Sequence, residues 1–346
     1  MERLKVGILG ATGAVGQRFI ELLENHPYFE LTSIVASEKN IGKKYSEVMK
    51  DKWTTSKEIP NYARELILEK CSPNLNCKIV FSALDSEIAE TIEKNFLKSG
   101  SIVISNSKNH RMDEEVPLLI PEVNPEHLEI IPKNSKGFIV TNPNCSTTGL
   151  ILALAPLHKK FKIKKIFVTT MQALSGAGYP GVPSPDILDN VVPYISGEEE
   201  KIESESLKIL GNIEENKIKF ADIKISAHCN RVSVKDGHLK TVSIEFEEKP
   251  PLEEIKKELE NFNPLKDLNL PSSPESLIKI KEESNRPQPK YDREEGKGMS
   301  VTVGRIRKCN LLDYKMIILS HNTIRGAAGG AILNAELLYK KGFLGN

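Results

Sequence analysis

The fold is decided by Lys5-Val6-Gly7-Ile8-Leu9-Gly10-Ala11-Thr12-Gly13-Ala14-Val15-Gly16, which is followed by apolar residues at helical spacing up to residue 23. Residues 5–9 predict a short buried strand, and residues 17–23 predict an amphipathic helix. Strand, glycine turn and helix in this order are typical of the first βα unit of a dinucleotide-binding fold, where glycines let the backbone approach a pyrophosphate. The spacing is GxxGxxG rather than GxGxxG, so its place directly after a strand carries much of the inference. The alternative is a plain tight turn.

Three more apolar segments, at residues 31–36, 78–84 and 101–104, predict further strands of a parallel sheet. The carboxyl ends of parallel strands meet at one edge, where ligands bind. Ser82, Leu84 and Asn106 are therefore candidates to line a cofactor. Arg111 follows shortly after. An arginine in such a loop is usually a solvated charge, but near a cleft it can bind a carboxylate or a phosphate with two parallel hydrogen bonds.

The residues after the second strand indicate which dinucleotide is bound. An NAD site usually has an acidic residue at the end of this strand to hold both ribose hydroxyls. Here Ser37 comes first and Lys39 follows, a hydroxyl and a cation that suit a 2′-phosphate. Glu38 between them argues the other way unless its side chain points outward. The pattern favours NADP.

A cysteine lies where a second strand–helix junction is expected. Residues 137–140 predict a strand, residues 150–157 predict a buried helix, and Pro143 suits the turn between them. Cys145 would then lie at the helix N-terminus, where free N–H groups and the helix dipole stabilise a thiolate. The hydroxyl residues 146–148 are natural caps for this helix. The alternative is a small buried core thiol.

After Cys145 the pattern changes to long alternating strands, which predict a second domain with a mostly antiparallel sheet packed by helices on one face. We expect strands at residues 165–172, 223–234, 239–246, 299–306 and 314–320, and helices at residues 188–195, 202–210 and 251–262. Residues 263–298 are expected to form a surface or intersubunit arm, and residues 40–77 a variable excursion. The last helix, from about residue 322 to 341, has a face of small residues that suits packing on the first domain. The predicted class is α/β: a Rossmann-type domain (1–142 and 323–346) plus an α+β catalytic and dimerisation domain (143–322).

The composition narrows the class of protein. The chain has 346 residues, enough for two domains, and its net charge of +1 argues against a nucleic-acid surface. The N-terminus enters a strand at once, so we expect no signal peptide, and no apolar run reaches the roughly 18 residues of a membrane span. Its five cysteines are scattered without paired spacing. This indicates free thiols in a reducing cytoplasm and no structural metal.

A dinucleotide fold combined with a cysteine at a helix start and a histidine on a later strand suggests covalent aldehyde chemistry. A thiolate attacks an activated acyl group to form a thioester, and hydride from a nicotinamide reduces the thioester to an aldehyde. An imidazole nearby handles the proton. His238, after a turn at Asp236-Gly237, is the best placed of the seven histidines, and His321 is its competitor.

At this point the chain closely resembles the aspartate-β-semialdehyde dehydrogenases of the archaeal and fungal branch. The resemblance runs essentially end to end and implies NADPH, a dimer or tetramer, and reversible conversion of L-4-aspartyl phosphate to L-aspartate 4-semialdehyde and phosphate. It also implies a place in the biosynthesis of lysine, threonine, methionine and isoleucine. The matching segments are GATGAVGQRF at 10–19, SNSKNHRM at 105–112, TNPNCSTTG at 141–149, QALSGAGYPG at 172–181, EEEK at 198–201, NRVSVKDGH at 230–238 and HNTIRGAAGG at 321–330.

The resemblance also implies a role for individual residues. Cys145 would be the nucleophile, His238 the acid/base catalyst and Gln172 the residue that positions the thioacyl intermediate. Arg231 would hold the substrate carboxylate. Glu198 is favoured for the ammonium group, with Glu199 and Glu200 as open alternatives. The remaining assignments are Arg111, Lys201 and Asn144 around the phosphate, Gly10, Thr12, Gly13, Ala14 and Val15 in the pyrophosphate turn, Ser37 and Lys39 at the 2′-phosphate, and Ser175, Gly176 and Asn322 near the nicotinamide.

Three alternatives differ in chemistry or class. Malonyl-CoA reductase resembles this chain over the glycine turn, the loop at 175–181 and the last helix, but there we expect a hydrophobic residue in place of Asn144. N-acetylglutamyl-phosphate reductase is more distant, because an aromatic residue typically follows its cysteine. A regulatory NADP-binding protein without catalysis is disfavoured by the intact set of Cys145, Gln172, Arg231 and His238.

Overall fold

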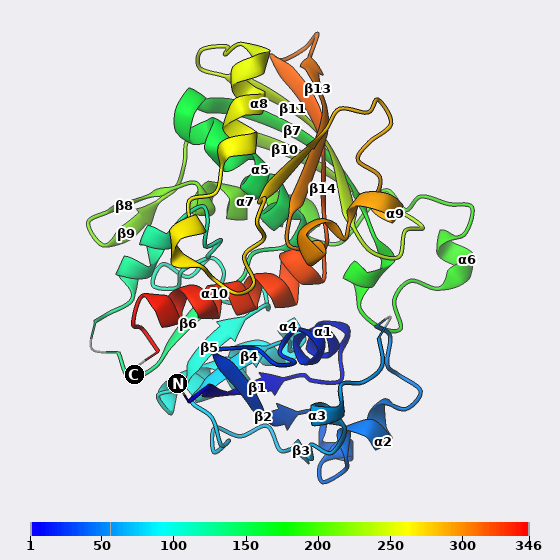
Figure 1. The fold of residues 1–346 in the computed structure, drawn as a ribbon, viewed down its shortest axis with the longest axis vertical. Coiled ribbons are helices and arrows are strands. Elements are labelled where there is room, and N and C mark those ends of the chain that lie inside the picture. The colour runs from blue at the N-terminus through cyan, green and yellow to red at the C-terminus, as the bar shows by residue number, and fades with distance from the viewer. Residues whose placement is uncertain (1, 56, 134, 345–346) are drawn as a thin grey trace.

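The computed structural model describes residues 2–55, 57–133 and 135–344. It contains two six-stranded sheets and a small two-stranded one. Figure 1 shows the first large sheet in the lower half, built from the N-terminal part of the chain, and the second in the upper half. Helix α10 (Gly329–Lys340) runs between them (Figure 1).

The first sheet has the strand order β3-β2-β1-β4-β5-β6, and all its strands are parallel. This is the order of a Rossmann sheet, as the glycine turn predicted. The segment expected to be a variable excursion supplies two short helices and the edge strand β3. The elements are β1 (Leu4–Leu9), α1 (Ala14–Leu22), β2 (Phe29–Val35), α2 (Tyr45–Met49), α3 (Asn61–Arg64), β3 (Leu68–Glu69), β4 (Ile79–Ser82), α4 (Ser86–Lys98), β5 (Ile102–Ser105) and β6 (Phe138–Thr141).

The second sheet has the order β10-β7-β11-β14-β13-β12. Its central pairs, β7–β11, β11–β14 and β13–β14, are antiparallel, whereas β10 and β12 join parallel at the two edges. Helices α5, α7 and α8 share one hydrophobic core with this sheet. The elements are α5 (Cys145–Phe161), β7 (Ile163–Gln172), α6 (Ser184–Ile187), α7 (Glu198–Ile209), β8 (Asn212–Glu214), β9 (Lys217–Lys219), β10 (Lys224–Arg231), β11 (His238–Phe246), α8 (Leu252–Asn261), β12 (Ile278–Lys281), α9 (Pro289–Asp292), β13 (Val301–Lys308) and β14 (Tyr314–Ser320).

Two predictions about this region are wrong. Residues 188–195 are not helical, because the helix ends at Ile187 and Asp189 then adopts a left-handed φ of 55°. Pro193 in the same segment has no N–H to donate to a helix. The segment 263–298 is not only a surface arm, because it contains β12, which pairs with β13 as an edge strand.

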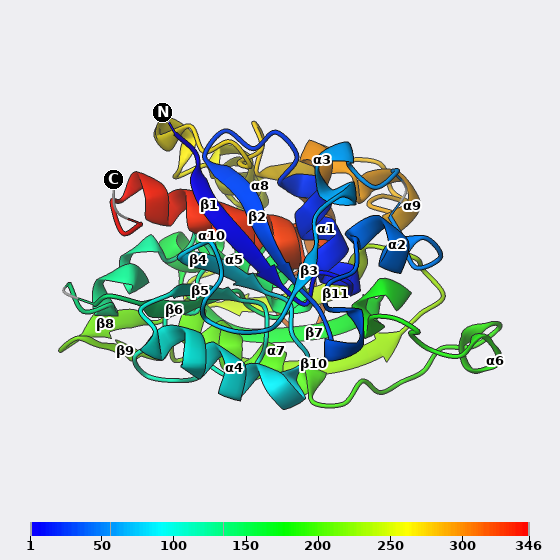
Figure 2. The ribbon, with the colours of Figure 1, turned by 90° about the horizontal axis from the view of Figure 1, so that it is seen from below.

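Helix α10 packs on the first sheet, although it follows the last strand of the second. Ala331, Leu333 and Leu337 lie in the same buried core as Val6 and Ile8 of β1. The view from below shows the same arrangement, with α10 directly behind the strands of the first sheet (Figure 2). The domain boundaries at residues 142 and 322 remain a prediction. None of the helices in the described ranges has the length and apolar composition that a bilayer span requires.

Candidate active site

Cys145 is the first residue of α5, and Asn144 caps this helix. The Asn144 side-chain oxygen accepts hydrogen bonds from the amides of Ser146 (2.9 Å) and Thr147 (3.3 Å). The prediction that residues 146–148 cap the helix is wrong. The hydroxyls of Ser146 and Thr147 have no partner among the described residues, and that of Thr148 donates to the Asn144 carbonyl. Only the residue before the helix has the extended backbone from which a side chain reaches the first free amides.

The sulfur of Cys145 lies 3.2 Å from Nε2 of His238, at the start of β11. The other ring nitrogen, Nδ1, accepts a hydrogen bond from the Ala173 amide at 3.0 Å. A nitrogen that accepts from an amide carries no proton, so the neutral ring carries its proton on Nε2 and directs it at the sulfur. The competing histidine, His321, is also buried, but its Nε2 lies 3.6 Å from Glu294 Oε1. The geometry therefore places His238 with the cysteine.

The free site does not hold a stabilised thiolate, which corrects the expectation drawn from the helix N-terminus. Burial raises the pKa of the Cys145 thiol to about 11, and the nearby Glu198 adds to the rise. Burial also lowers the pKa of His238 well below its ordinary value, with Lys240 acting in the same direction. Both groups are therefore neutral at pH 7 before substrate binds. Desolvation outweighs the helix dipole, which is worth about 1 kcal/mol at a helix end.

Glu198 lies at the centre of a buried polar cluster beside Cys145. Its carboxylate accepts hydrogen bonds from Asn144 Nδ2 (2.9 and 3.1 Å), Gln172 Nε2 (3.2 Å) and Lys201 Nζ (2.7 Å). Burial acts to raise the pKa of Glu198, but Lys201 and the hydrogen bonds from Asn144 and Gln172 outweigh it, so the pKa is lowered. Glu198 is therefore ionised at pH 7. Of the two alternatives, Glu199 accepts from the Cys229 amide and Glu200 is exposed, so neither faces this cluster.

Arg111 is held by a residue that the sequence reasoning missed. Its Nη1 donates to Glu205 Oε1 at 2.9 Å and its Nη2 to the Asn106 carbonyl at 2.8 Å. The other oxygen of Glu205 accepts from the Asn144 amide at 2.7 Å. One turn further along α7, the ammonium of Lys208 donates to three carbonyls of the Arg111 loop, at residues 111, 113 and 116.

Four charged residues of α7 thus lie on one face of the helix, at positions 198, 201, 205 and 208. This 3-4-3 spacing is that of a single helix face, and it was the available signal for Glu205 and Lys208. Only the first turn of this helix was predicted to carry site residues. Among the described residues, the side chains on this face contact both the polar cluster around Glu198 and the loop that carries Arg111.

The loop after β7 closes over the cysteine and histidine. Arg231, at the end of β10, is buried and donates to the Ala173 carbonyl at 2.7 Å. A side chain at Gly176 would place its Cβ 3.0 Å from Arg231 Nη1 and 3.1 Å from His238 Cε1, so only glycine fits easily here. Asn322 ties the loop to the β10–β11 turn, because it donates to Ser175 Oγ and accepts from the Gly237 amide, both at 2.8 Å.

A π-helical turn, Ile324–Ala328, packs against Cys145. A Cβ added at Gly326 would lie 2.6 Å from the Cβ of Cys145. Arg325 anchors this turn through two hydrogen bonds to the buried carboxylate of Glu122, at 2.8 and 2.6 Å. The small residues of 326–330 were predicted only to form a helix-packing face, and this contact with Cys145 was not predicted.

The glycine turn fits a dinucleotide pyrophosphate. Gly10 has a φ of +83°, and a Cβ there would lie 2.6 Å from the Ala83 carbonyl. A Cβ at Gly16 would lie 2.2 Å from the Gly10 carbonyl, so helix α1 can pack this closely only through glycine. Gly13 is the N-cap of α1 and offers no side-chain cap, which leaves the first amides available to an anion.

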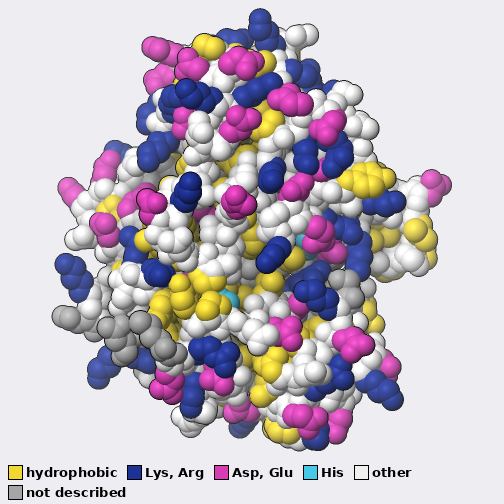
Figure 3. Space-filling view, in the orientation of Figure 1, with side chains coloured by type: hydrophobic (Ala, Val, Ile, Leu, Met, Phe, Trp, Pro, Cys, Tyr) yellow, Lys and Arg dark blue, Asp and Glu magenta, His cyan; other side chains and the backbone are white. Residues whose placement is uncertain are grey.

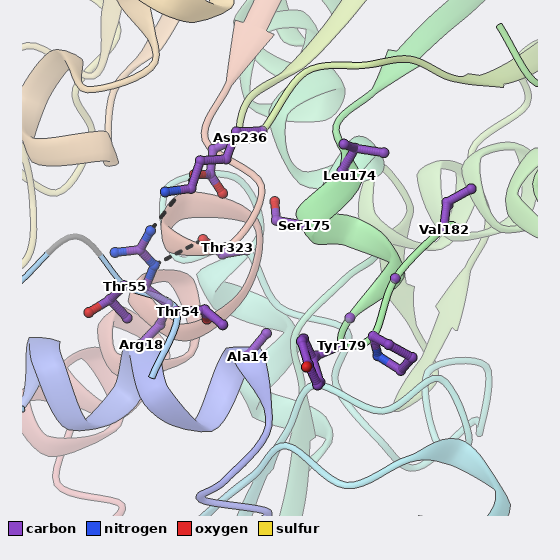
Figure 4. A pocket seen from close by; sticks show the side chains of 14 residues that line it. Ala14, Arg18, Thr54, Thr55, Leu174, Ser175, Tyr179, Val182, Asp236 and Thr323 are labelled. Atoms are coloured by element: carbon purple, nitrogen blue, oxygen red, sulfur yellow. Dashed lines mark hydrogen bonds and ion pairs between the residues drawn. The ribbon is translucent and has the colours of Figure 1, made fainter. Parts of the chain in front are cut away.

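Two cavities lie on either side of this turn. One, of about 580 Å³, is lined by Gly10, Thr12 and Gly13 together with Ser37, Glu38 and Leu84. The cation that lines it is Lys70, whereas Lys39 does not, so the structure does not bring Lys39 to this site. The second, of about 310 Å³, lies between Ala14 of α1 and Ser175 of the loop after β7 (Figure 4). Arg18 crosses its edge to contact Thr323 at 3.2 Å and Asp236 at 4.0 Å (Figure 4).

The remaining predicted cofactor residues lie behind the cavity walls. Ser82 is fully buried at the end of β4, and Val15 packs against the core of the first sheet. Asn106 donates to the Ser82 carbonyl at 3.3 Å and accepts from Asn142 at 3.2 Å. These contacts shape the sheet edge rather than the surface of either cavity.

Comparisons with known proteins agree with this geometry. Residues 5–131 match the family model "Semialdehyde dehydrogenase, NAD binding domain", and residues 154–325 match "Semialdehyde dehydrogenase, dimerisation domain". An aspartate-semialdehyde dehydrogenase from Archaeoglobus fulgidus is 52% identical, with 98% of this chain and 99% of that one covered. The crystal structure of the Candida albicans aspartate semialdehyde dehydrogenase with NADP is 43% identical, with a TM-score of 0.91 over 98% of this chain and 99% of that one. The Vibrio cholerae aspartate semialdehyde dehydrogenase II, complexed with ASA, is 26% identical, with a TM-score of 0.80 over 98% and 99% of the two chains. The chain belongs to the aspartate-semialdehyde dehydrogenase family.

Proposed function

We propose that the chain catalyses the NADPH-dependent reductive dephosphorylation of L-4-aspartyl phosphate to L-aspartate 4-semialdehyde, with Cys145 as nucleophile. The observation that carries this proposal is the 3.2 Å contact between Cys145 Sγ and His238 Nε2 at the start of α5. The relatives that share the fold over nearly the whole chain carry the name of this enzyme.

The buried charges around Cys145 match the three charged groups of the substrate. The ionised Glu198 is the partner for the α-ammonium, and Arg231 is the partner for the α-carboxylate. Arg111, Lys201 and Asn144 receive the phosphate. The Nε of Arg111 is buried and has no partner among the described residues, so it can donate to an incoming anion.

The Cys145 thiol first loses its proton to water, and the resulting thiolate attacks the acyl carbon of the substrate. A C–S bond forms, the bond between the acyl carbon and the phosphate oxygen breaks, and phosphate leaves with its electron pair. When bound, NADPH would supply the hydride that reduces the resulting thioester. The C–S bond then breaks, the aldehyde leaves and the sulfur regains its negative charge. The Nε2–H of His238 stabilises negative charge on the sulfur, and Gln172 holds the thioacyl group in line with it.

The two cavities suit the two halves of NADP. Its adenosine half fits the cavity lined by Ser37, and its nicotinamide half fits the cavity lined by Ser175. The pyrophosphate then crosses the N-terminus of α1 at Gly13, between them. We propose Lys70 beside Ser37 as the cation for the 2′-phosphate, in place of Lys39. The Candida albicans relative was solved with NADP.

The test is phosphate-dependent reduction of NADP with aspartate semialdehyde, run beside oxidation of NADPH with malonyl-CoA. We expect activity only with the semialdehyde, and we expect C145S to abolish it while NADPH binding is retained. Activity with malonyl-CoA would show that Asn144 does not select the substrate. Activity in C145S would refute the nucleophile.

We also propose that the protein is a homodimer or a homotetramer built from dimers through the second domain. The matched dimerisation domain spans residues 154–325. Large exposed apolar side chains gather in the segment around α6, at Tyr179, Leu188, Val191 and Tyr194. The same segment projects from the molecule (Figure 1), and Figure 3 shows apolar atoms on it beside a surface where both charge signs alternate. Light scattering of the purified protein separates a dimer from a tetramer, and a monomer would contradict the proposal.

A further inference from the structure

Lys240 is a fully buried lysine in β11, two residues after His238. Its ammonium donates to Ser320 Oγ at 3.0 Å and to the His238 carbonyl at 3.3 Å, both uncharged acceptors. None of the ion pairs between described residues includes it. A buried ammonium without a carboxylate costs several kcal/mol in general, so its place in this core calls for a reason.

The ammonium lies beneath the first turn of α5, close to the reactive pair. Residues 238 and 240 lie on the same, buried face of β11, and His238 is in register with Ser320 of β14. A Cβ added at Gly149 would lie 3.1 Å from Lys240 Nζ and 2.1 Å from Ser320 Oγ. Gly149 is four residues after Cys145, which puts the two on one face of the helix, about 5–6 Å apart. The missing side chain at Gly149 makes room for the ammonium.

We propose that Lys240 acts as a fixed positive charge behind the Cys145–His238 pair and favours the thiolate form of Cys145. It is a positioning residue, because it acts on the nucleophile through space and does not touch the substrate. The inference rests on the role proposed above for Cys145.

Lys240 differs from the other cations near the sulfur because it does not bind a charged group of the substrate. Arg231 and Arg111 receive the substrate carboxylate and phosphate, so their charges are largely cancelled when substrate is bound. Lys240 is sealed below the site and keeps its charge for the sulfur. It therefore supports the thiolate at the stage of the cycle when the thiolate is needed.

The charges around Lys240 agree with its proposed effect on the thiolate. Burial lowers the pKa of Lys240 to about 8, so the ammonium remains mostly charged at pH 7, and a thiolate at Cys145 would hold that proton more firmly. Lys240 is also the foremost of the cations that oppose the burial-driven rise in the pKa of Cys145. The groups that face this region are Glu198 and Lys201 from α7, Arg111 from the loop after β5, Cys229 and Arg231 from β10, His238 from β11 and His321 after β14.

The test measures the rate at which iodoacetamide alkylates Cys145 in the full-length protein at a series of pH values. The Cys145 peptide is quantified by mass spectrometry. We expect K240M to slow alkylation about tenfold near pH 7, where Lys240 is charged in the parent, and the difference to shrink toward pH 10 as Lys240 loses its proton. S320A is the matched control, since it removes a hydroxyl partner of Lys240 and keeps the charge; its rate near pH 7 should stay with that of the parent. A rate near pH 7 in K240M equal to that of the parent overturns the proposal.

K240R separates the charge from the packing if K240M fails to bind NADPH or to fold. With the charge retained, K240R should keep the parent rate of alkylation near pH 7, and K240Q should be slowed as K240M is. Equal slowing in K240R and K240Q would also overturn the proposal. None of these measurements uses turnover, so they stand apart from the test of the reaction. Activity in C145S would refute the nucleophile but leave the effect of Lys240 on the thiol measurable.

Discussion

Arg111 and Glu205 form a buried ion pair, with Nη1 and Oε1 2.9 Å apart. The same carboxylate accepts from the amide of Asn144, the residue directly before Cys145. Glu205 therefore joins the proposed phosphate-binding guanidinium to the start of α5. The role of this buried ion pair is to orient the Arg111 guanidinium before the substrate binds.

Replacing Glu205 by Gln keeps the shape of the side chain and removes its charge. The guanidinium then loses a charge-assisted hydrogen bond, worth about 1.5 kcal/mol, and is free to rotate away from the phosphate position. We expect the KM for phosphate in the oxidative direction to rise about tenfold, with a smaller change in kcat. Initial rates against phosphate concentration measure both constants.

The control for this variant is E200Q, an exposed glutamate in the first turn of the same helix. Its kinetics should match those of the parent. An unchanged KM for phosphate in both E205Q and E200Q would show that Glu205 does not orient Arg111.

Asn144 has two separable duties, which two substitutions distinguish. N144A removes the cap of α5 and should lower the free energy of unfolding by about 1 kcal/mol in urea titrations. N144D keeps an oxygen that can cap the helix, but it places a second carboxylate beside Glu198, which now lies 2.9 Å from Nδ2. We expect N144D to keep more stability than N144A and to lose most of its activity. Equal stability and activity in the two variants would contradict this division.

Much of the fold was predictable from the sequence because its signals are local. The glycine turn after β1 predicts the Rossmann sheet, and the alternation from Tyr314 to Ser320 predicts β14 to the residue. The missed strand, β12, has only four residues, and two of them are lysines in a run rich in proline and serine. An edge strand this short is defined by its pairing with β13, which no local pattern reveals.

Candidate site residues were predictable where the residue type itself implies a reaction. They were not predictable where a charged residue only positions another residue of the site. Cys145 and His238, which the structure places 3.2 Å apart, could be proposed together because few side chains perform the chemistry expected of them. Glu205, Lys208 and Lys240 were missed because a charged residue in a helix or strand is usually on the surface. A stabilised thiolate was predicted from the helix N-terminus alone, whereas burial, which raises the pKa of Cys145, depends on packing of segments that are distant in the sequence.

His238 should carry its proton on Nε2 in the free enzyme and should not titrate near pH 6.5. Burial and Lys240 lower its pKa, and the Ala173 amide occupies Nδ1, where a second proton would have to sit. Nitrogen-15 NMR of the ring should therefore show one protonated and one unprotonated nitrogen, unchanged as the pH falls from 8 through 6.5. A titration with a midpoint near 6.5 would contradict the tautomer. Proton transfer through Nε2 during turnover then requires the ring to leave the Ala173 amide.

The buried ammonium of Lys240 should make stability rise with pH in a defined window. Its pKa is about 8 in the folded chain and 10.5 when exposed, so between these values the unfolded chain binds one more proton than the folded chain. Stability then increases with pH across this window, and the cost of burying the charge is present in full below pH 8.

K240M removes this titration, so its advantage over the parent should be largest at pH 7–8 and should shrink toward pH 10. The full shift corresponds to about 3 kcal/mol, and the part reached by pH 9.5 to about 2 kcal/mol. Urea unfolding at pH 7.5 and pH 9.5 measures the difference between the two proteins at each pH. Comparing differences cancels the contribution of Lys208, which burial also brings to a pKa of about 8 and which both proteins retain. A difference between K240M and the parent that stays constant over this window would show that Lys240 does not titrate there.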